Sequence, residues 1–311
     1  MAKSVALFGK DMFGEAIRAP SAGLVADRFV VPPFSFLDSR QGYWQERKRA
    51  WLNLGIRSEV GRSAKAFNIH EWLDEKEGAS RGASDGTSIF DPVLCELAYR
   101  WFSPPDGQIL DPFAGGSVRG LVAGILGRRY HGIDLRVEQI AANEAQAVAL
   151  AKDLQAVPVW TCGDSATAPM PPADLVFSCP PYADLERYSD DPEDLSTMTY
   201  DAFRAVYSAI IMRAVAALRP DRFAVFVVGD LRCPKGLYRN FPGHTIEAFE
   251  AAGARLYNEA ILLTAIGSLP LRINRQFTAG RKLGKTHQNV LVFVKGDPRK
   301  AADACGVIGV D

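Results

Sequence analysis

Short, unbroken runs of Val, Ile, Leu and Phe alternate with helix-like segments from about residue 89 onward. Strands without polar alternation are typically buried on both faces. Such strands, alternating with helices, predict an α/β fold whose mostly parallel sheet is covered by helices on both sides. A loop without a helix joins the last two strands, which predicts that the closing strand is antiparallel. We expect seven strands, at residues 108–113, 129–135, 157–164, 173–180, 222–230, 258–264 and 289–296.

The first part of the chain has a different character. Residues 1–85 contain few β-branched runs but three tryptophans and a basic cluster, and the small polar stretch 77–88 is typical of a linker. We therefore expect an N-terminal accessory segment over 1–85, an α/β domain over 86–299 and a C-terminal tail over 300–311.

Composition excludes several classes of protein. The 311 residues include 36 Lys+Arg and 36 Asp+Glu, so any nucleic-acid binding must come from a local patch. The five cysteines form no C-x-x-C pair, which favours reduced thiols in the cytoplasm and argues against a zinc site. His131 and His244 have no partner at metal-ligand spacing, so we expect no metal. No apolar run approaches the ~18 residues of a membrane span, so none is expected.

Three acidic residues follow three successive strands. The first strand ends in Asp111-Pro112-Phe113-Ala114-Gly115-Gly116-Ser117, a turn whose glycines allow close approach of a ligand. Asp134 lies about 20 residues further on, where an acid binds ribose hydroxyls in nucleotide-binding sheets. Asp164 ends the third strand and can accept from an adenine amino group. No phosphate-loop lysine is present, which argues against ATP. If these three acids were ordinary turn residues, their placement at the ends of three successive strands would be hard to explain.

The fourth strand ends in Ser178-Cys179-Pro180-Pro181-Tyr182. Two consecutive prolines fix the backbone and remove two N–H donors, so the turn is rigid. The tyrosine that follows offers a flat face on which a base can stack. The alternative is a proline-terminated buried strand with an ordinary core tyrosine.

Together these motifs resemble the S-adenosylmethionine-dependent DNA amino-methyltransferases, the N4-cytosine and N6-adenine enzymes, over roughly residues 89–296. The resemblance implies a Rossmann-like methyltransferase sheet with S-adenosylmethionine as cofactor. It assigns Asp111 and Gly115 to the methionine end, Asp134 to the ribose and Asp164 to the adenine. Phe90 belongs to an upstream cofactor-contacting segment. Pro112, Phe113 and Ala114 complete the cofactor site. Pro180, Pro181 and Tyr182 hold the flipped base, and with Ser178 and Cys179 they form the catalytic turn. The overall pattern suggests a phage- or prophage-type modification enzyme.

Two departures from that family matter. In the glycine turn the second glycine and the serine stand in the reverse order to that of the family, and we expect the cofactor pocket to tolerate this change. The residue before Pro-Pro is Cys179, a weak acceptor, where the family has Asp, Asn or Ser. Either backbone carbonyls near Ser178 and Cys179 hold the base amino group, or the Cys179 thiolate adds to C6 of cytosine for methylation at C5. A third alternative is a small buried residue tolerated in place of serine.

Two segments are candidates for contact with DNA. We expect residues 265–288 to be a loop; it carries five cations and no acid and is a plausible phosphate clamp. Near the N-terminus, Trp44 and Arg47 belong to a stretch that interleaves aromatics and cations. The alternatives are a solvated basic loop and a surface helix whose tryptophans pack on the domain. The five loop cations are Arg272, Arg275, Arg281, Lys282 and Lys285.

Other functions stay open at this point. Pro-Pro-Tyr turns also serve RNA and protein-amide methyltransferases, and a non-catalytic DNA-binding protein can keep the same fold. A modification enzyme can also act beside a restriction nuclease or a phage partner. The acidic stretch 184–194 follows the catalytic turn and either gates the pocket or is a solvated loop.

Overall fold

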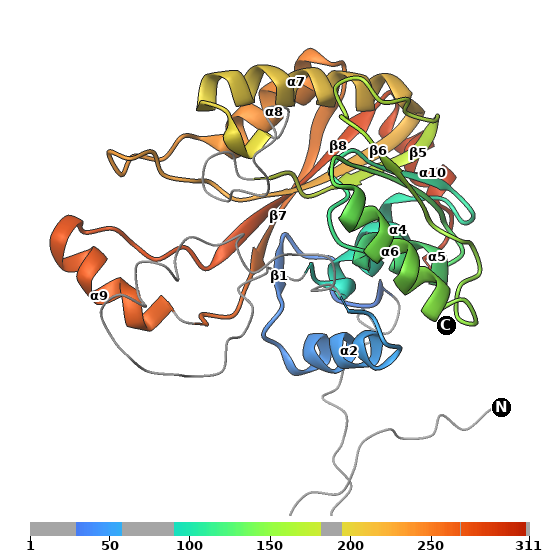
Figure 1. The fold of residues 1–311 in the computed structure, drawn as a ribbon, viewed down its shortest axis with the longest axis horizontal. Coiled ribbons are helices and arrows are strands. Elements are labelled where there is room, and N and C mark those ends of the chain that lie inside the picture. The colour runs from blue at the N-terminus through green and yellow to red at the C-terminus, as the bar shows by residue number, and fades with distance from the viewer. Residues whose placement is uncertain (1–28, 58–89, 182–194, 268, 309–311) are drawn as a thin grey trace, which may run out of the picture.

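A twisted sheet of eight strands runs through the centre of the computed structural model, which describes residues 29–57, 90–181, 195–267 and 269–308 (Figure 1). Its strand order is β1-β7-β8-β6-β5-β2-β3-β4. The strands are β1 (Phe36–Asp38), β2 (Gln108–Asp111), β3 (Arg129–Asp134), β4 (Val159–Cys162), β5 (Ala173–Ser178), β6 (Leu218–Val228), β7 (Arg255–Leu263) and β8 (His287–Lys295).

The direction of the strands agrees with the expectation, but their number does not. β8 is antiparallel to both β6 and β7, and the other pairs are parallel. The seven expected strands are all present. The eighth, β1, comes from the segment that we expected to be a separate accessory, and it pairs with β7 at the edge of the sheet.

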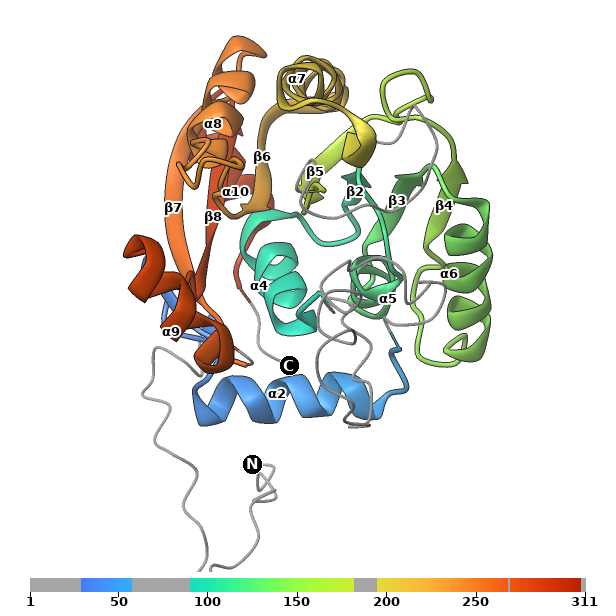
Figure 2. The ribbon, with the colours of Figure 1, turned by 60° about the vertical axis from the view of Figure 1, so that its left-hand side comes forward.

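Helices cover both faces of the sheet. Figure 2 shows α7 and α8 on one side and α4, α5 and α6 on the other. The helices are α2 (Gly42–Asn53), α4 (Pro92–Phe102), α5 (Val118–Ile125), α6 (Val137–Ala149), α7 (Tyr200–Ala217), α8 (Phe241–Ala251), α9 (Leu269–Gly280) and α10 (Pro298–Cys305), with a short 3₁₀ turn at Leu195–Thr197. In the described ranges no helix is both long and apolar enough to span a membrane.

α9 corrects one prediction, because it occupies half of the segment 265–288 that we expected to be a loop. Its apolar residues Leu269, Ile273 and Phe277 recur every fourth position, which is a helical period. Pro270 falls in the first turn, where a missing N–H costs little. α10 crosses the expected boundary at residue 299 and buries Ala301 in the core.

Alternate residues of β6 belong to two different cores. Val225 and Val227 pack with α4 on one face, while Ala224 and Phe226 pack with α7 and α8 on the other. All four side chains are fully buried. This is why β6 carries an unbroken apolar run: neither face of the strand meets water.

The N-terminal segment packs onto the α/β domain through α2. Trp44 has no exposed surface, and its indole N–H donates to Asp91 Oδ2 at 3.2 Å. The Arg47 Nε donates to Glu96 Oε2 at 2.6 Å, and Trp51 Nε1 donates to the same oxygen at 2.8 Å. Of the two alternatives for this stretch, Trp44 fits the second: it packs on the domain, so the prediction that it contacts DNA is wrong. Arg47 likewise serves the attachment of α2 to α4.

The buried carboxylate of Glu96 makes this attachment sensitive to acid. Burial by itself raises the pKa of Glu96, but the hydrogen bonds and charge of Arg47, with Trp51 and Arg100, outweigh it and hold the pKa below the ordinary 4.5. The carboxylate therefore stabilises the fold above its unfolded pKa, and this contribution is lost as pH falls through the lower folded pKa.

We predict that Glu96→Gln lowers the free energy of unfolding by about 2 kcal/mol near neutral pH, since it removes the negative charge that accepts three hydrogen bonds from Arg47 and Arg100 and one from Trp51, but leaves arginines that can reach water. Urea unfolding should show this difference shrinking in acid, below the pKa of folded Glu96. Glu144→Gln, at an exposed position of α6, is the matched control. Equal stability of the Glu96 variant and the control at neutral pH would contradict the prediction.

Candidate functional site

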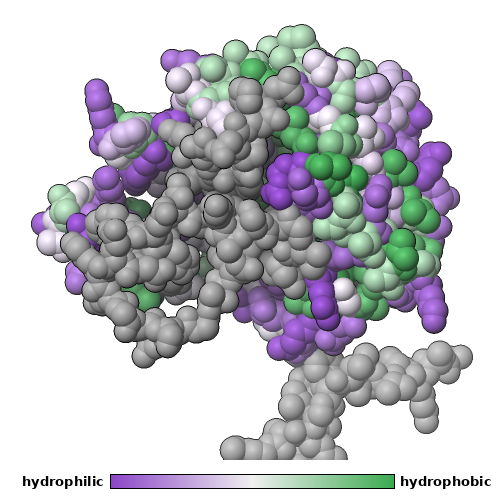
Figure 3. Space-filling view, viewed as in Figure 1, coloured by the Kyte–Doolittle hydropathy of each residue, from purple (hydrophilic) through white to green (hydrophobic). Residues whose placement is uncertain are grey.

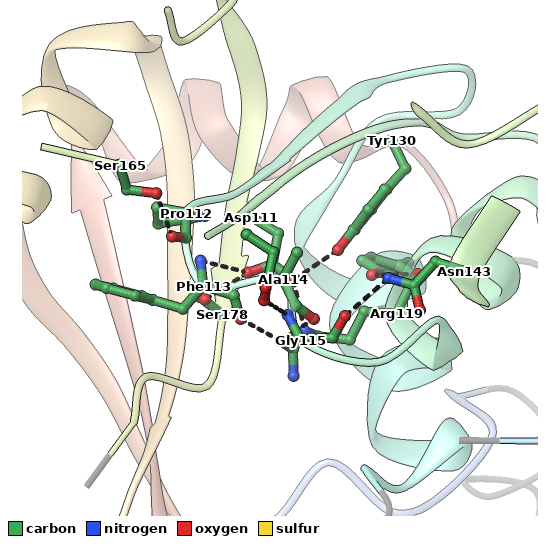
Figure 4. Close-up of polar contacts among 12 residues, drawn as sticks. Asp111, Pro112, Phe113, Ala114, Gly115, Arg119, Tyr130, Asn143, Ser165 and Ser178 are labelled. Carbon is green, nitrogen blue, oxygen red and sulfur yellow. Dashed lines mark hydrogen bonds and ion pairs between the residues drawn. The ribbon is translucent and has the colours of Figure 1, made fainter. Parts of the chain in front are cut away.

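Asp111 holds the glycine turn in place. Its carboxylate is fully buried and accepts four hydrogen bonds (Figure 4). Oδ1 accepts from Phe113 N at 3.1 Å and Ser178 Oγ at 2.5 Å. Oδ2 accepts from Arg119 Nε at 2.5 Å and Tyr130 Oη at 2.7 Å. Asp111 was expected to contact the methionine end of the cofactor, but its acceptor positions are occupied by protein donors, so it positions the turn instead.

Arg119 completes this arrangement from the first turn of α5. Its Nη2 donates to Phe113 O at 2.6 Å and to Ala114 O at 2.8 Å, and its Cζ lies 4.7 Å from the centre of the Phe90 ring. Burial would lower the pKa of Arg119, but the charge of Asp111 more than offsets this and raises it. Sequence reasoning missed this residue. The available signal was a single arginine within an apolar helix.

Asp134 closes the other side of the turn. Its Oδ2 accepts from Gly115 N at 2.9 Å and its Oδ1 from Arg136 N at 2.9 Å. Burial raises the pKa of Asp134, and these two backbone N–H groups oppose that rise. The Asn143 amide donates to Gly115 O at 2.8 Å, so both polar groups of this glycine peptide are fixed. Each Asp134 oxygen keeps a lone pair for a further donor, as a ribose contact requires.

The turn after β4 joins the same edge of the sheet. Ser165 Oγ donates to Pro112 O at 2.6 Å, which ties this turn to the glycine turn. Asp164 is half-buried, and its Oδ1 accepts from Ala166 N at 2.8 Å. Within the described part of the chain its Oδ2 accepts no hydrogen bond, so an oxygen is available to an adenine amino group.

The Pro-Pro turn lies beside the glycine turn. Ser178 ends β5, is fully buried and reaches Asp111, while Cys179 is half-buried and Pro180 is buried. Beneath them Phe177 packs edge-on against Phe90, with ring centres 5.7 Å apart. The last residue of the motif, Tyr182, lies outside the described residues.

The turn has features that a cofactor can use. Among the described residues, Ser117 Oγ is buried without a hydrogen-bond partner, and Gly115 adopts a positive φ of 51°. At Gly132 on β3, a Cβ would lie 2.7 Å from Ala114 Cβ and 2.8 Å from the Tyr130 ring. The Ser117 hydroxyl, the remaining lone pairs of Asp134 and the Oδ2 of Asp164 fit the polar groups of an adenosine-containing amino acid such as S-adenosylmethionine.

The expected DNA-contacting cations are divided between helix α9 and the connection from α9 to β8. Arg272 and Arg275 lie in α9, and Arg281 follows it with its Cζ 5.3 Å from the Phe277 ring centre. Lys282 and Lys285 lie between α9 and β8. α9 projects from the body of the protein at the left of Figure 1.

Comparison with known proteins finds similarity in structure only. No family model matches the sequence, and no curated protein does. One similar structure is a TehB-like SAM-dependent methyltransferase from Corynebacterium glutamicum, with 18% identity and a TM-score of 0.40, covering 73% of this chain and 95% of that one. Another is magnesium protoporphyrin IX methyltransferase from Synechocystis with bound SAM, with 10% identity and a TM-score of 0.45, covering 75% and 93%.

A putative RNA methyltransferase from Pyrococcus horikoshii is also similar, with 12% identity and a TM-score of 0.45, covering 74% of this chain and 97% of that one. The cofactor expected from the sequence, S-adenosylmethionine, is the one bound in the Synechocystis structure. All three TM-scores lie below 0.5, so no substrate and no residue role transfers from these proteins.

The close packing at Gly132 generates a prediction about the cofactor site. Gly132→Ala should displace the glycine turn, because the added methyl group meets Ala114 and Tyr130 at less than contact distance. We expect a loss of about 1–3 kcal/mol in stability. Isothermal titration should show weakened binding of S-adenosylhomocysteine. Gly42→Ala, where a Cβ meets open space, should change neither quantity. Unchanged binding by the Gly132 variant would refute the assigned position of the cofactor.

Proposed function

We propose that this chain is a DNA methyltransferase that uses S-adenosylmethionine and modifies the amino group of a flipped base, N4 of cytosine or N6 of adenine. One observation carries the proposal. The hydrogen bond from Ser178 Oγ to Asp111 Oδ1 joins the candidate cofactor turn to the candidate catalytic turn. Methyl transfer needs donor and acceptor side by side, and the two turns are adjacent at one edge of the sheet.

The cofactor, when bound, supplies an electrophilic methyl group on a sulfonium. Asp134 would accept from the ribose hydroxyls and Asp164 from the adenine amino group. Asp111 and Arg119 would keep the backbone of the turn in its binding conformation. The turn residues Pro112, Phe113, Ala114 and Gly115 and the neighbouring Phe90 would line this pocket.

The Pro-Pro turn would hold the base. Pro180 and Pro181 carry no N–H, so this stretch of backbone presents acceptors only. The carbonyls of Ser178 and Cys179 can accept from the amino group that is methylated and thereby orient its nitrogen toward the methyl group. Positioning of this kind accounts for much of the rate in such transfers. Extracting the base from a duplex costs a few kcal/mol, which contacts with the DNA backbone must offset.

A second candidate function is C5 methylation of cytosine, with Cys179 as the nucleophile. The observation in its favour is that Arg119 and Ser178, the neighbour of Cys179, donate to the same carboxylate of Asp111. Burial lowers the pKa of Arg119, but Asp111 and Tyr130 and, to a smaller degree, the negative charge of a Cys179 thiolate raise it. A neighbouring guanidinium stabilises the anionic form that nucleophilic addition needs. The half-buried position of Cys179 leaves part of the residue accessible.

Nucleoside mass spectrometry distinguishes these reactions. The protein is incubated with S-adenosylmethionine and unmethylated DNA, and the digested DNA is compared with standards. We predict N4-methylcytosine or N6-methyladenine, with activity retained in Cys179→Ser. The exposed Cys162→Ser is the matched control. C5-methylcytosine that disappears only in the Cys179 variant would establish the second candidate instead.

Three outcomes would overturn the proposal. Methyl transfer to tRNA but not DNA indicates an RNA enzyme, and transfer to protein amides indicates a protein methyltransferase. No thermal stabilisation by S-adenosylmethionine or S-adenosylhomocysteine indicates a non-catalytic DNA-binding protein. As part of the same proposal, we place the enzyme in the cytoplasm as a phage-type modification enzyme, with or without a nuclease partner.

A further inference from the structure

The connection between β6 and α8 contains a closed hairpin that the sequence motifs did not identify. Cys233 N donates to Leu237 O at 2.8 Å, and Gly236 N donates to Cys233 O at 2.7 Å. Arg232 and Tyr238 face each other in an antiparallel bridge. Pro234 occupies the second position of this turn, where its fixed φ is favoured. The backbone of residues 231–239, here called the 231–239 hairpin, is therefore preorganised.

The 231–239 hairpin leaves the sheet at the edge that carries the candidate site. β6 is paired with β5 up to Ser178 opposite Phe226, and with β8 from Val228 opposite Asn289. Because β8 is antiparallel, residues 281–287, which lead into it and end at its first residue, enter the sheet at this same edge. Figure 1 shows the hairpin and α9 projecting on the same side of the molecule, and purple, hydrophilic residues lie on the hairpin in Figure 3.

Side chains from the two segments meet. The Arg232 Cζ lies 3.9 Å from the centre of the Tyr238 ring, and the Lys285 Nζ lies 5.8 Å from it. Lys282 reaches the hairpin, since a Cβ built on Gly236 would lie 2.6 Å from its Nζ. Lys235 is exposed at the turn.

These cations have no acidic partners within the described ranges. Arg232, Lys235, Lys282 and Lys285 form no ion pair with a described Asp or Glu. The nearby Asp230 uses its Oδ1 to accept from two backbone N–H groups at the base of the hairpin. Burial lowers the pKa of Lys285; the charge of Asp230 opposes this, and the charge of Arg232 adds a smaller lowering. A partly buried cation beside a second cation is stabilised by an added anion.

We propose that the 231–239 hairpin and residues 281–287 form one surface that binds the DNA backbone, with Arg232, Lys282 and Lys285 as phosphate contacts around Tyr238. Phosphates recur at short, regular intervals along a strand, which suits several cations spread over two segments. The ring of Tyr238 is 47% exposed and Leu237 is 67% exposed, so apolar surface for sugars and bases lies between the charges. The inference rests on the proposed function, because it takes DNA as the polyanion.

The test is the salt dependence of DNA binding, measured by fluorescence anisotropy on a labelled duplex. Each phosphate contact contributes roughly 0.9 to the slope of log K against log salt. The double variant Arg232→Gln/Lys285→Gln should therefore reduce that slope by about 2 and weaken binding at low salt. The control variant Arg255→Gln/Lys300→Gln also removes two positive charges, both at exposed positions, and should leave the slope unchanged. Arg255 begins β7 and therefore lies at the end of the sheet opposite to the candidate site. Titration with S-adenosylhomocysteine checks that each variant keeps its fold.

An unchanged slope in the Arg232/Lys285 variant, or an equal loss in the control variant, would overturn the inference. Tighter binding of RNA than of DNA to the same surface would also overturn it. The two proposals fail separately, because anisotropy needs no methyl transfer. Salt-dependent DNA binding without methylated nucleosides would overturn only the proposed function. Methylated DNA together with an unchanged slope would overturn only the inferred DNA-binding surface.

Discussion

The buried carboxylate of Asp111 is the constraint on which the rest of the site depends. A charge without exposed surface is tolerated only if it is paired and hydrogen-bonded, and Asp111 meets this need with four donors from β3, α5, the end of β5 and its own turn. Each donor belongs to a segment with its own place in the sheet. Satisfying one carboxylate therefore fixes the relative positions of the glycine turn, the first turn of α5 and the Pro-Pro turn.

This arrangement shows how a parallel sheet brings the two candidate turns together, as the proposed methyl transfer requires. Parallel strands bring their carboxyl ends to one edge, and β2, β3, β4, β5 and β6 all end there. The reversed strand β8 begins at the same edge, so the segment 281–287 joins it. Candidate groups for the cofactor, the base and the DNA backbone thus come together from segments far apart in the sequence. The N-terminal segment contributes differently: α2 packs behind α4 through Glu96 and supports the helix that carries Asp91 and the neighbouring Phe90.

The sequence predicts the sheet well because the patterns that specify strands are made by neighbouring residues. Unbroken apolar runs indicate β5 and β6, and the acids that follow the strands indicate the end of the sheet at which the candidate site lies. What it could not predict depends on tertiary contacts. The burial of Trp44 depends on where α2 docks, and the saturation of Asp111 depends on Arg119 and Tyr130, which no motif marks. α9 was expected to be a loop because its charges obscured a four-residue apolar period. β1 is only three residues long, too short for a pattern.

The central claim is that Asp111 couples the catalytic turn to the cofactor turn, and Ser178→Ala tests it most directly. The substitution removes one hydrogen bond to Asp111 without adding bulk. The account predicts that affinity for S-adenosylhomocysteine, measured by isothermal titration, falls about tenfold, the equivalent of one charge-assisted hydrogen bond. Ser103→Ala, another fully buried serine whose hydroxyl donates to Tyr99 O at the end of α4, should leave that affinity unchanged. Wild-type affinity in the Ser178 variant would contradict the account.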